Sequence, residues 1–404
     1  MSFSRTDRSR LAEWWFTVDR QLIALILALM GAGLLLSLAA SPAIAMKRGF
    51  ATYHFVWRQF VFAGLGASIM IAVSLLTPAQ IRRLAVATLA ASLAGLIAVL
   101  FVGTEINGAR RWLPILHQTL QPSEFAKPGF IVMSAWLFAE TKRRPDMPAL
   151  TLACSSLILI AALLIAEPDV GQTLLVTFVW GALFVLSGQP WLGAVVLATL
   201  ATAGAGTAYV MLPHVHARVD RYIAGGSGDH SQVDRALQAF MEGGFFGRGP
   251  GEGTVKTVLP DAHTDFIFAV LAEEYGVLAC LSLLTLFAAI TGRAVLRAAN
   301  ETDSANRLAI FGLTLLFAMQ ALINMGVNVG LLPAKGMTLP FISAGGSSTL
   351  AVSVTLGMLL SLTRKRTGLA NLKKPRLVAT RPLRMSAEPS NEQNSGGKAR
   401  HGGR

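Results

Sequence analysis

Residues that could move a proton gather where one long apolar segment begins. Asp265 closes the stretch Leu-Pro-Asp-Ala-His-Thr-Asp and starts an apolar run that continues to residue 292. As a helix this run would be about 42 Å long, against about 30 Å for the hydrocarbon core of a bilayer. We therefore expect Asp265 about two turns above the core boundary, which we place near Glu273. A carboxylate there could act as a general base, although on spacing alone we favour a helix cap formed by Thr264 and Asp265.

Cations that could bind an anionic substrate precede another apolar run. Arg110 and Arg111 come first, and a helix capped by Ser123 is predicted to follow them. Lys127 then lies inside an otherwise apolar stretch, and ionisable residues at the mouth of a span are functional candidates. The alternative, given equal weight, is that Lys127 reaches the interface or pairs with Glu124 at i,i+3.

Two pairs of acids need an explanation. Glu167 and Asp169 lie in a turn between apolar runs, where they could hold a cation or face a partner charge. We favour a capped, water-exposed turn. Glu273 and Glu274 enter a span side by side, so they need partners or water.

The segment 331–348 carries two prolines and an apolar middle, which predicts a loop packed back into the protein. Lys335 and Ser343 lie in this loop. Gly345 and Gly346 open the next span, where free N–H groups suit a phosphate or diphosphate, and suit a plain helix start equally well.

A polar stripe lies inside one apolar run, with Gln320, Asn324 and Asn328 spaced i, i+4, i+8. Hydrogen bonding between helices is the default interpretation. A lining for a polar headgroup or a translocation path is the alternative.

The longest polar segment is 213–264. Apolar residues at helical spacing within 232–241 predict an amphipathic helix on the membrane surface. The glycines at 249–253 lack the spacing of a nucleotide-binding loop and lie outside any βαβ unit. We expect this Gly-rich loop to fold back on the membrane surface.

Composition decides which elements must hold these residues. Of the 404 residues 53% are hydrophobic and 14% charged, with a net charge of +13. Soluble domains are about one quarter charged, so we predict a polytopic membrane protein and exclude a nucleic-acid partner. Cys154 and Cys280 lie in apolar runs, which argues against a disulfide framework.

Runs of roughly 20 apolar residues mark the spans. We predict an all-α fold with about ten transmembrane helices, of which the fourth and sixth are short, at 22–45, 60–77, 84–102, 124–139, 149–166, 172–187, 191–212, 265–292, 308–332 and 347–363. Most Lys and Arg residues then fall on one side, which the positive-inside rule assigns to the cytoplasm. Both termini are therefore predicted to be cytoplasmic, and the first span is too long for a signal peptide.

Three regions follow from this topology. Residues 1–21 form a cytoplasmic N-terminal segment, and 22–363 form the transmembrane domain. The latter includes the large periplasmic loop 213–264 between spans seven and eight. Residues 364–404 are basic and rich in Pro, Ser, Gly and Asn, which predicts a disordered cytoplasmic tail.

Four motifs occur in order along the chain: QPSEFAK at 121–127, EPDVGQ at 167–172, LPDAHTDF at 259–266 with AEE at 272–274, and PAKGMTLPFIS at 333–343. In these motifs residues 13–365 resemble the SEDS family (shape, elongation, division and sporulation). The GPGEG stretch at 249–253 resembles its cell-division branch more than its rod-shape branch. One departure is Ala344, where the family usually has tyrosine, and the role of that hydroxyl is open here.

The resemblance implies a peptidoglycan glycosyltransferase of the bacterial inner membrane that polymerises lipid II at the septum, with its active site facing the periplasm. Implied partners are a class B penicillin-binding protein and other divisome membrane proteins. It also implies that Asp265 is the general base and that Lys127 orients it and keeps it ionised. Candidates for binding the substrate, the first three for its diphosphate, are Arg110, Arg111, Lys335, Glu124, His263, Thr264, Ser343, Gly345 and Gly346. A divalent cation, Mg²⁺ or Mn²⁺, is a further candidate, and no organic cofactor is expected.

Two other functions stay open on the sequence. A lipid II transporter would use the polar stripe and the acids at 273–274 as its path. A division scaffold without chemistry would act through the basic tail and the periplasmic loop.

Overall fold

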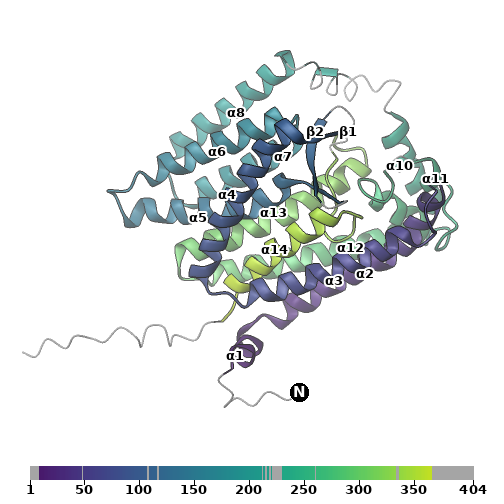
Figure 1. Cartoon of the computed structure of the whole chain (residues 1–404), viewed down its shortest axis with the longest axis horizontal. Coiled ribbons are helices and arrows are strands. Elements are labelled where there is room, and N and C mark those ends of the chain that lie inside the picture. Colours follow the sequence, from purple (N-terminus) through teal and green to yellow (C-terminus); the bar gives the residue numbers. More distant parts are fainter. Residues whose placement is uncertain are drawn as a thin grey trace, which may run out of the picture. The chain divides into compact units, whose positions relative to one another are not determined.

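The computed structural model describes residues 9–365 except 48, 107–108, 116–117, 212, 214–215, 218–219, 221–229, 260 and 334–335. Long helices dominate the described part of the chain (Figure 1). They are α1 (Arg10–Thr17), α2 (Arg20–Lys47), α3 (His54–Ser74), α4 (Pro78–Val102), α5 (Pro122–Arg143), α6 (Ala149–Ala166), α7 (Val170–Leu186), α8 (Trp191–Met211), α10 (His230–Gly243), α11 (Val255–Val258), α12 (Ile267–Ala299), α13 (Ser304–Asn328) and α14 (Gly346–Leu362).

Each predicted span overlaps one helix, namely α2 to α8 and α12 to α14. Within the described residues, seven of these helices are long and apolar enough to cross a membrane, while α7 and α14 are shorter apolar helices. The prediction of a short fourth span was wrong, because α5 has 22 residues and continues through a polar end that includes Lys142 and Arg143. The sixth, α7, is short, with 17 residues.

A small antiparallel sheet between α4 and α5 was not predicted. Its strands are β1 (Thr104–Ile106), β2 (Ala109–Ile115) and β3 (Gln118–Leu120), in the order β1-β2-β3. Strands β1 and β3 have three residues each, too few to show the apolar alternation by which a strand is usually recognised, and the seven residues of β2 (ARRWLPI) do not alternate. The sheet matters because β2 carries Arg110 and Arg111.

Close helix contacts in the bundle depend on small residues, as is usual between membrane helices. A Cβ atom at Gly129 of α5 would lie 2.7 Å from the carbonyl oxygen of Ala85 in α4. One at Gly357 of α14 would lie 2.9 Å from the carbonyl oxygen of Met70 in α3. Any side chain at either glycine would push the two helices apart.

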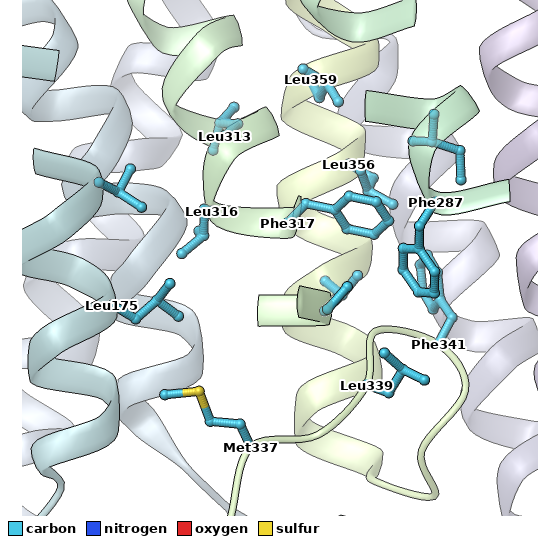
Figure 2. Packing of buried hydrophobic residues seen from close by; sticks show 14 of the residues in the cluster. Leu175, Phe287, Leu313, Leu316, Phe317, Met337, Leu339, Phe341, Leu356 and Leu359 are labelled. Atoms are coloured by element: carbon cyan, nitrogen blue, oxygen red, sulfur yellow. The ribbon is translucent and has the colours of Figure 1, made fainter. Parts of the chain in front are cut away.

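The loop between α13 and α14 is packed inside the bundle, as predicted. Leu339 and Phe341 are buried and belong to one hydrophobic cluster with Phe317 of α13 and Leu356 of α14 (Figure 2). Since irregular backbone is tolerated at membrane depth only where protein covers it, this burial lets the chain run as a loop there.

Helix α12 is interrupted, contrary to the straight helix expected from residue 265. Gly276 has φ +80°, and the Gly-rich segment after α10 fills the break. The N–H groups of Val277 and Leu278 donate to the carbonyls of Gly244 and Phe245, 2.9 and 3.3 Å away.

The same segment also completes the other side of the break. Arg248 and Gly249 donate their backbone N–H groups to the carbonyls of Glu273 and Glu274, at 2.9 and 3.0 Å. The backbone groups freed by the break are thereby satisfied by protein. The predicted amphipathic helix is confirmed as α10, while the segment that follows it packs into α12.

Candidate functional site

Asp265 lies in a tight turn directly before α12. The backbone N–H groups of Thr264 and Asp265 both donate to the carbonyl of Asp261 at 3.0 Å, and Asp261 itself has φ +50°. The helix begins after Phe266, which provides no side-chain cap. The capping interpretation was therefore wrong: Thr264 donates its hydroxyl to Asp261, and among the described residues the Asp265 carboxylate makes no hydrogen bond or ion pair.

The Asp265 carboxyl has a raised pKa. The side chain is half-buried, and burial together with the negative charge of Asp261 raises the pKa of Asp265 from 3.8 to about 7. A carboxylate of that pKa accepts a proton far more readily than an ordinary aspartate at neutral pH. The motif places Asp261 four residues before Asp265, but the effect of its charge on the pKa of Asp265 was not predicted.

The backbone around Asp265 is held at three successive carbonyls. That of His263 accepts from the N–H of Ala344 at 2.9 Å, and that of Thr264 accepts from the hydroxyl of Ser343. Two carboxamides on α13 then donate to the Asp265 carbonyl, Asn324 at 3.0 Å and Asn328 at 2.9 Å. The position of the carboxylate is thus set by groups distant in sequence.

The polar stripe on α13 performs the structural role that was its default interpretation. The Nδ2 atom of Asn324 also donates to the carbonyl of Met337 at 2.6 Å, and Nε2 of Gln320 donates to that of Thr338 at 3.3 Å. Oδ1 of Asn328 accepts the N–H of Ala269 in the first turn of α12, at 3.0 Å. The stripe therefore joins the α13–α14 loop to the start of α12.

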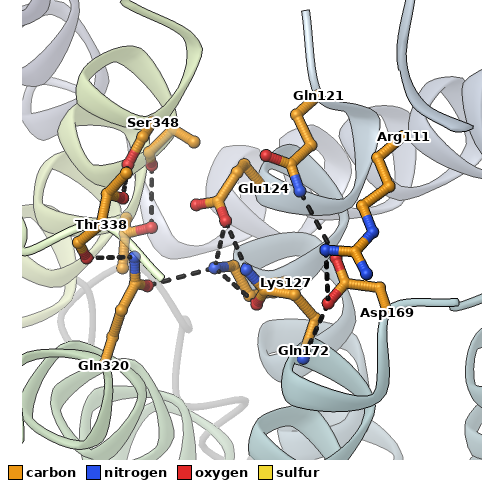
Figure 3. Close-up of polar contacts among 11 residues, drawn as sticks. Arg111, Gln121, Glu124, Lys127, Asp169, Gln172, Gln320, Thr338 and Ser348 are labelled. Carbon is orange, nitrogen blue, oxygen red and sulfur yellow. Dashed lines mark hydrogen bonds and ion pairs between the residues drawn. The ribbon is translucent and has the colours of Figure 1, made fainter. Parts of the chain in front are cut away.

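Lys127 is the centre of a buried polar cluster (Figure 3). Its ammonium donates to Glu124 at 2.9 Å, to Gln172 at 3.0 Å and to Gln320 at 3.1 Å. Lys127 and Glu124 are only 2% and 4% exposed, so the predicted i,i+3 pair is confirmed, while a lysine that reaches the interface is not found. The resemblance implies that Lys127 orients Asp265 and keeps it ionised, but among the described residues its ammonium binds these three side chains and forms no ion pair with Asp265.

Arg111 binds the turn between α6 and α7. It donates to the carbonyls of Glu167, at 3.2 Å, and Pro168, and lies 3.8 Å from the carboxylate of Asp169 (Figure 3). Asp169 caps α7 by accepting from the N–H of Gln172. The turn is buried and not water-exposed as favoured, so the alternative of a partner charge is the one that holds.

Arg110, the neighbour of Arg111 on β2, points into a different environment. It is exposed and forms an ion pair with Glu105 at 3.4 Å. An exposed guanidinium can exchange such a weak pair for an anionic ligand at little cost. Of the two arginines, Arg110 is therefore the one available to a substrate.

Residues 20–368 match the family described as the cell cycle proteins FtsW, RodA and SpoVE. The chain belongs to this family. It is 45% identical over 368 residues to the probable peptidoglycan glycosyltransferase FtsW of Caulobacter vibrioides (strain NA1000 / CB15N), covering 91% of this chain and 94% of the relative. To the protein of the same description from Hydrogenovibrio crunogenus (strain DSM 25203 / XCL-2) it is 34% identical, covering 88% and 93%.

Solved structures agree with this membership. A chain from a study on structural coordination of polymerization and crosslinking by a peptidoglycan synthase complex matches with a TM-score of 0.72 and 29% identity, covering 86% of this chain and 98% of the other. The rod shape determining protein RodA of Thermus thermophilus matches with a TM-score of 0.63 and 26% identity, covering 87% and 99%. The chain is thus a SEDS protein of the cell-division branch, a multi-pass membrane protein and a glycosyltransferase.

The family motif AEE includes the two acids that needed partners. Glu273 accepts the N–H groups of Val255 and Lys256, at 2.6 and 3.0 Å, and so caps α11. Glu274 forms a buried ion pair with the Lys256 ammonium. Lys256 was missed because the sequence signals that the acids need a cation but does not say which one.

The other residues predicted to bind substrate either make contacts within the fold or lie outside the described residues. His263 is buried with its ring 5.2 Å from that of Phe55, and Ser343 is buried as well. Gly345 precedes α14 without a side-chain cap, and a Cβ atom at Gly346 would lie 2.6 Å from the ring of Phe62. Lys335 lies outside the described residues.

The described residues form no evident binding site for a divalent cation. Across the described ranges, no three His, Cys, Asp or Glu side chains gather into a set that could hold a metal ion. Mg²⁺ commonly takes few protein ligands and binds substrate phosphates instead. A divalent cation bound near the described residues would therefore need ligands from a bound molecule, such as phosphate oxygens.

Proposed function

We propose that this protein polymerises lipid II into glycan strands during septal cell-wall synthesis, with Asp265 as the general base. The observation that carries the proposal is the Asp265 carboxylate. It is half-buried, has a pKa of about 7, has no structural partner among the described residues, and sits on a backbone anchored at three carbonyls. A group that is fixed in place, able to accept a proton near neutral pH and not used in folding suits general-base catalysis.

In the proposed reaction, Asp265 takes the proton from the 4-hydroxyl of the acceptor sugar. The hydroxyl oxygen forms a bond to the anomeric carbon of the donor, whose bond to the diphosphate oxygen breaks. The electron pair leaves with the undecaprenyl diphosphate, and the configuration inverts to a β-1,4 linkage. The exposed guanidinium of Arg110 is a candidate to stabilise the departing negative charge, with Lys335 and a divalent cation as further candidates.

Lys127 takes an indirect part in this proposal. Its ammonium donates a hydrogen bond to Oε1 of Gln320, and Nε2 of Gln320 donates one to the carbonyl of Thr338. One turn further along α13, Asn324 connects the neighbouring Met337 to the Asp265 carbonyl. Lys127 therefore supports the base through the α13–α14 loop.

The proposed partners are a class B penicillin-binding protein, which would cross-link the new glycan, and other divisome membrane proteins. Support comes from the likeness to a chain of a complex that coordinates polymerization and crosslinking. We further propose that the protein acts in the inner membrane at the septum, with Asp265 facing the periplasm and both termini in the cytoplasm.

The test is polymerisation of purified lipid II in detergent by the full chain bound to its transpeptidase partner. We expect glycan strands from the wild type and a loss of about 10²- to 10⁴-fold for Asp265→Asn. Asp261→Asn, assayed at a pH well above 7 where Asp265 is deprotonated in both proteins, is the matched control, because it removes a neighbouring carboxylate and keeps the base. Full activity of a folded, partner-bound Asp265→Asn protein would show that the base is assigned wrongly. Strands formed without any bilayer would exclude pure transport and pure scaffolding.

A further inference from the structure

Helix α1 lies next to the start of the first span but does not continue it. The residue after α1, Val18, has an extended backbone with φ −70° and ψ 149°, and the span of α2 begins at Arg20. Figure 1 shows α1 at the end of α2 and out of line with that helix. Because a span begins at the edge of the hydrocarbon core, α1 lies at the level of the lipid headgroups.

One side of α1 is fixed to the helix bundle. Nε1 of Trp14 donates to the hydroxyl of Ser74 at the end of α3, at 2.9 Å. Arg364, shortly after α14, donates from Nε to the hydroxyl of Thr17 at 2.9 Å, and the backbone N–H of Lys365 donates to the Thr17 carbonyl at 3.0 Å. The helix is therefore a fixed part of the folded protein, and its other side has a defined orientation.

The acid between α1 and α2 is taken up by α12. Asp19 is only 4% exposed and forms ion pairs with Arg293 at 2.9 Å and with Arg297 at 2.6 Å. Its negative charge is thus compensated inside the protein and does not repel an anion at the surface of α1.

The side of α1 that does not contact the bundle is apolar. Leu11, Trp15 and Phe16, which we call the α1 strip, are between 41% and 53% exposed. Leu11 and Trp15 are four residues apart and so lie on one side of the helix, and Phe16 extends that side around the buried Ala12. Tryptophan is enriched at the membrane–water interface, and helices that lie in this plane turn Trp, Phe and Leu towards the acyl chains.

A cation accompanies the α1 strip. The guanidinium of Arg20 is exposed and lies 4.7 Å from the centre of the Trp15 ring. Its Nε and Nη2 atoms donate to the Trp15 carbonyl, both at 3.4 Å, which is longer than an ordinary hydrogen bond. The two nearest acids in the sequence, Asp19 and Glu13, pair with other arginines. The planar fork of Arg20 can therefore turn to a phosphate at little cost.

The basic tail starts at the same place. Residues 364–404 contain eleven Lys and Arg residues and two acids, Glu388 and Glu392. Its first residue, Arg364, is bound to Thr17 of α1. Positive charge attached beside an apolar strip favours an anionic membrane surface over a neutral one.

We propose that α1 binds an anionic phospholipid, with Arg20 on the headgroup phosphate and the upper part of the acyl chains along Leu11, Trp15 and Phe16. The site is separate from the Asp265 turn and does not depend on the proposed glycosyl transfer. Its assignment to the cytoplasmic leaflet follows from the proposed topology.

The experiment uses the full chain in nanodiscs of phosphatidylcholine. One series contains a rising fraction of phosphatidylglycerol brominated on its acyl chains, and a parallel series contains brominated phosphatidylcholine. Bromine quenches tryptophan fluorescence on contact, and the part due to Trp15 is the difference between the wild type and Trp15→Phe, which keeps a ring beside Arg20. We expect this part to reach half of its maximum at an about fivefold lower fraction of phosphatidylglycerol than of phosphatidylcholine.

Variants then separate the charge from the apolar contact. Arg20→Gln, compared with Arg20→Gln/Trp15→Phe, should remove the preference for phosphatidylglycerol and keep the quenching. Leu11→Ser/Phe16→Ser should reduce the quenching of Trp15 by both lipids. Arg83→Gln is the matched control and should keep the preference, since Arg83 is an exposed arginine in the first turns of α4.

Three results would overturn the inference. If neither brominated lipid quenched Trp15, the α1 strip would not lie in the leaflet. Equal midpoints for the two lipids would show contact with the membrane but no site for an anionic headgroup. A preference that survives Arg20→Gln would show that Arg20 does not bind the phosphate.

Discussion

The pair formed by Lys127 and Glu124 gives the sharpest test of the buried cluster. Both side chains are almost fully buried, and the ammonium makes three hydrogen bonds between 2.9 and 3.1 Å. Lys127→Met removes the cation and leaves the Glu124 carboxylate buried, with Gln172 as its remaining donor at 2.7 Å. Removing one partner of a buried pair costs about 3–5 kcal/mol. Because Gln172 stays, we expect the lower end, about 3 kcal/mol in the free energy of unfolding.

The double variant Glu124→Gln/Lys127→Met removes both charges at once. Replacing a buried ion pair by neutral groups of similar size is often neutral. We therefore expect its unfolding free energy to return to within about 1 kcal/mol of the wild type, which makes it about 2 kcal/mol more stable than Lys127→Met. Glu140→Gln, on the same helix, is the control: Glu140 pairs with Arg144 at 3.4 Å and Arg143 at 3.9 Å, and both arginines are exposed. Because its loss leaves only water-exposed cations behind, this change should cost less than about 1 kcal/mol.

The assay is reversible unfolding of the purified protein in mixed micelles with increasing SDS, followed by helix content. A Lys127→Met variant that loses less than 1 kcal/mol, or a double variant as unstable as the single one, would refute the argument from burial. Polymerisation adds a second readout. A double variant that is as stable as the wild type but inactive would show that the charges of Lys127 and Glu124 act in the reaction and not only in support of the α13–α14 loop.

Three further predictions concern pH and backbone. Asp265 must be deprotonated to accept a proton, so the initial rate should rise with pH through about 7. Asp261→Asn removes a negative charge, lowers that pKa and should move the rise to lower pH; an unchanged pH–rate profile would contradict this. Burial and then the charge of Asp169 raise the pKa of Glu167 from 4.5 to about 8. Between pH 4.5 and about 8 the folded protein keeps a proton on Glu167 that the unfolded chain has already released. The free energy of unfolding should therefore fall as the pH rises from 4.5 to about 8. Glu167→Gln should make this fall smaller, as measured by unfolding at both pH values. Gly276→Ala should cost at least about 1–3 kcal/mol in thermal or SDS unfolding, because φ is +80° there and a Cβ atom would lie 2.3 Å from a carbonyl oxygen; an unchanged midpoint would contradict the break in α12.

The long helices and their order were predictable because apolar length is a local property. Each predicted span overlaps one helix, and the i,i+3 pair of Glu124 and Lys127 was anticipated from spacing. Burial of the α13–α14 loop was also predictable, since prolines within an apolar stretch exclude both a helix and a solvated loop.

The errors concern polar groups whose partners are distant in sequence. The turn with Glu167 and Asp169 looked water-exposed because nothing nearby reveals that Arg111 lies against it. Lys127 was expected beside Asp265, although its ammonium is held by Gln172 and Gln320. The break in α12 was not predicted either. A glycine in an apolar run indicates a break only if another segment binds the backbone groups that the break leaves unpaired.

The residues alone were enough to tell that this is a membrane protein, where its helices run and which family motifs it carries. These follow from hydrophobic length and from ordered residue types, which the chain displays without being folded. Which charged groups are used in folding, and which stay available, became clear only in the folded protein. A buried polar group must find a partner wherever the fold provides one. Arg111, Lys127 and Lys256 are taken up in this way, whereas the carboxylate of Asp265 is held only through its backbone.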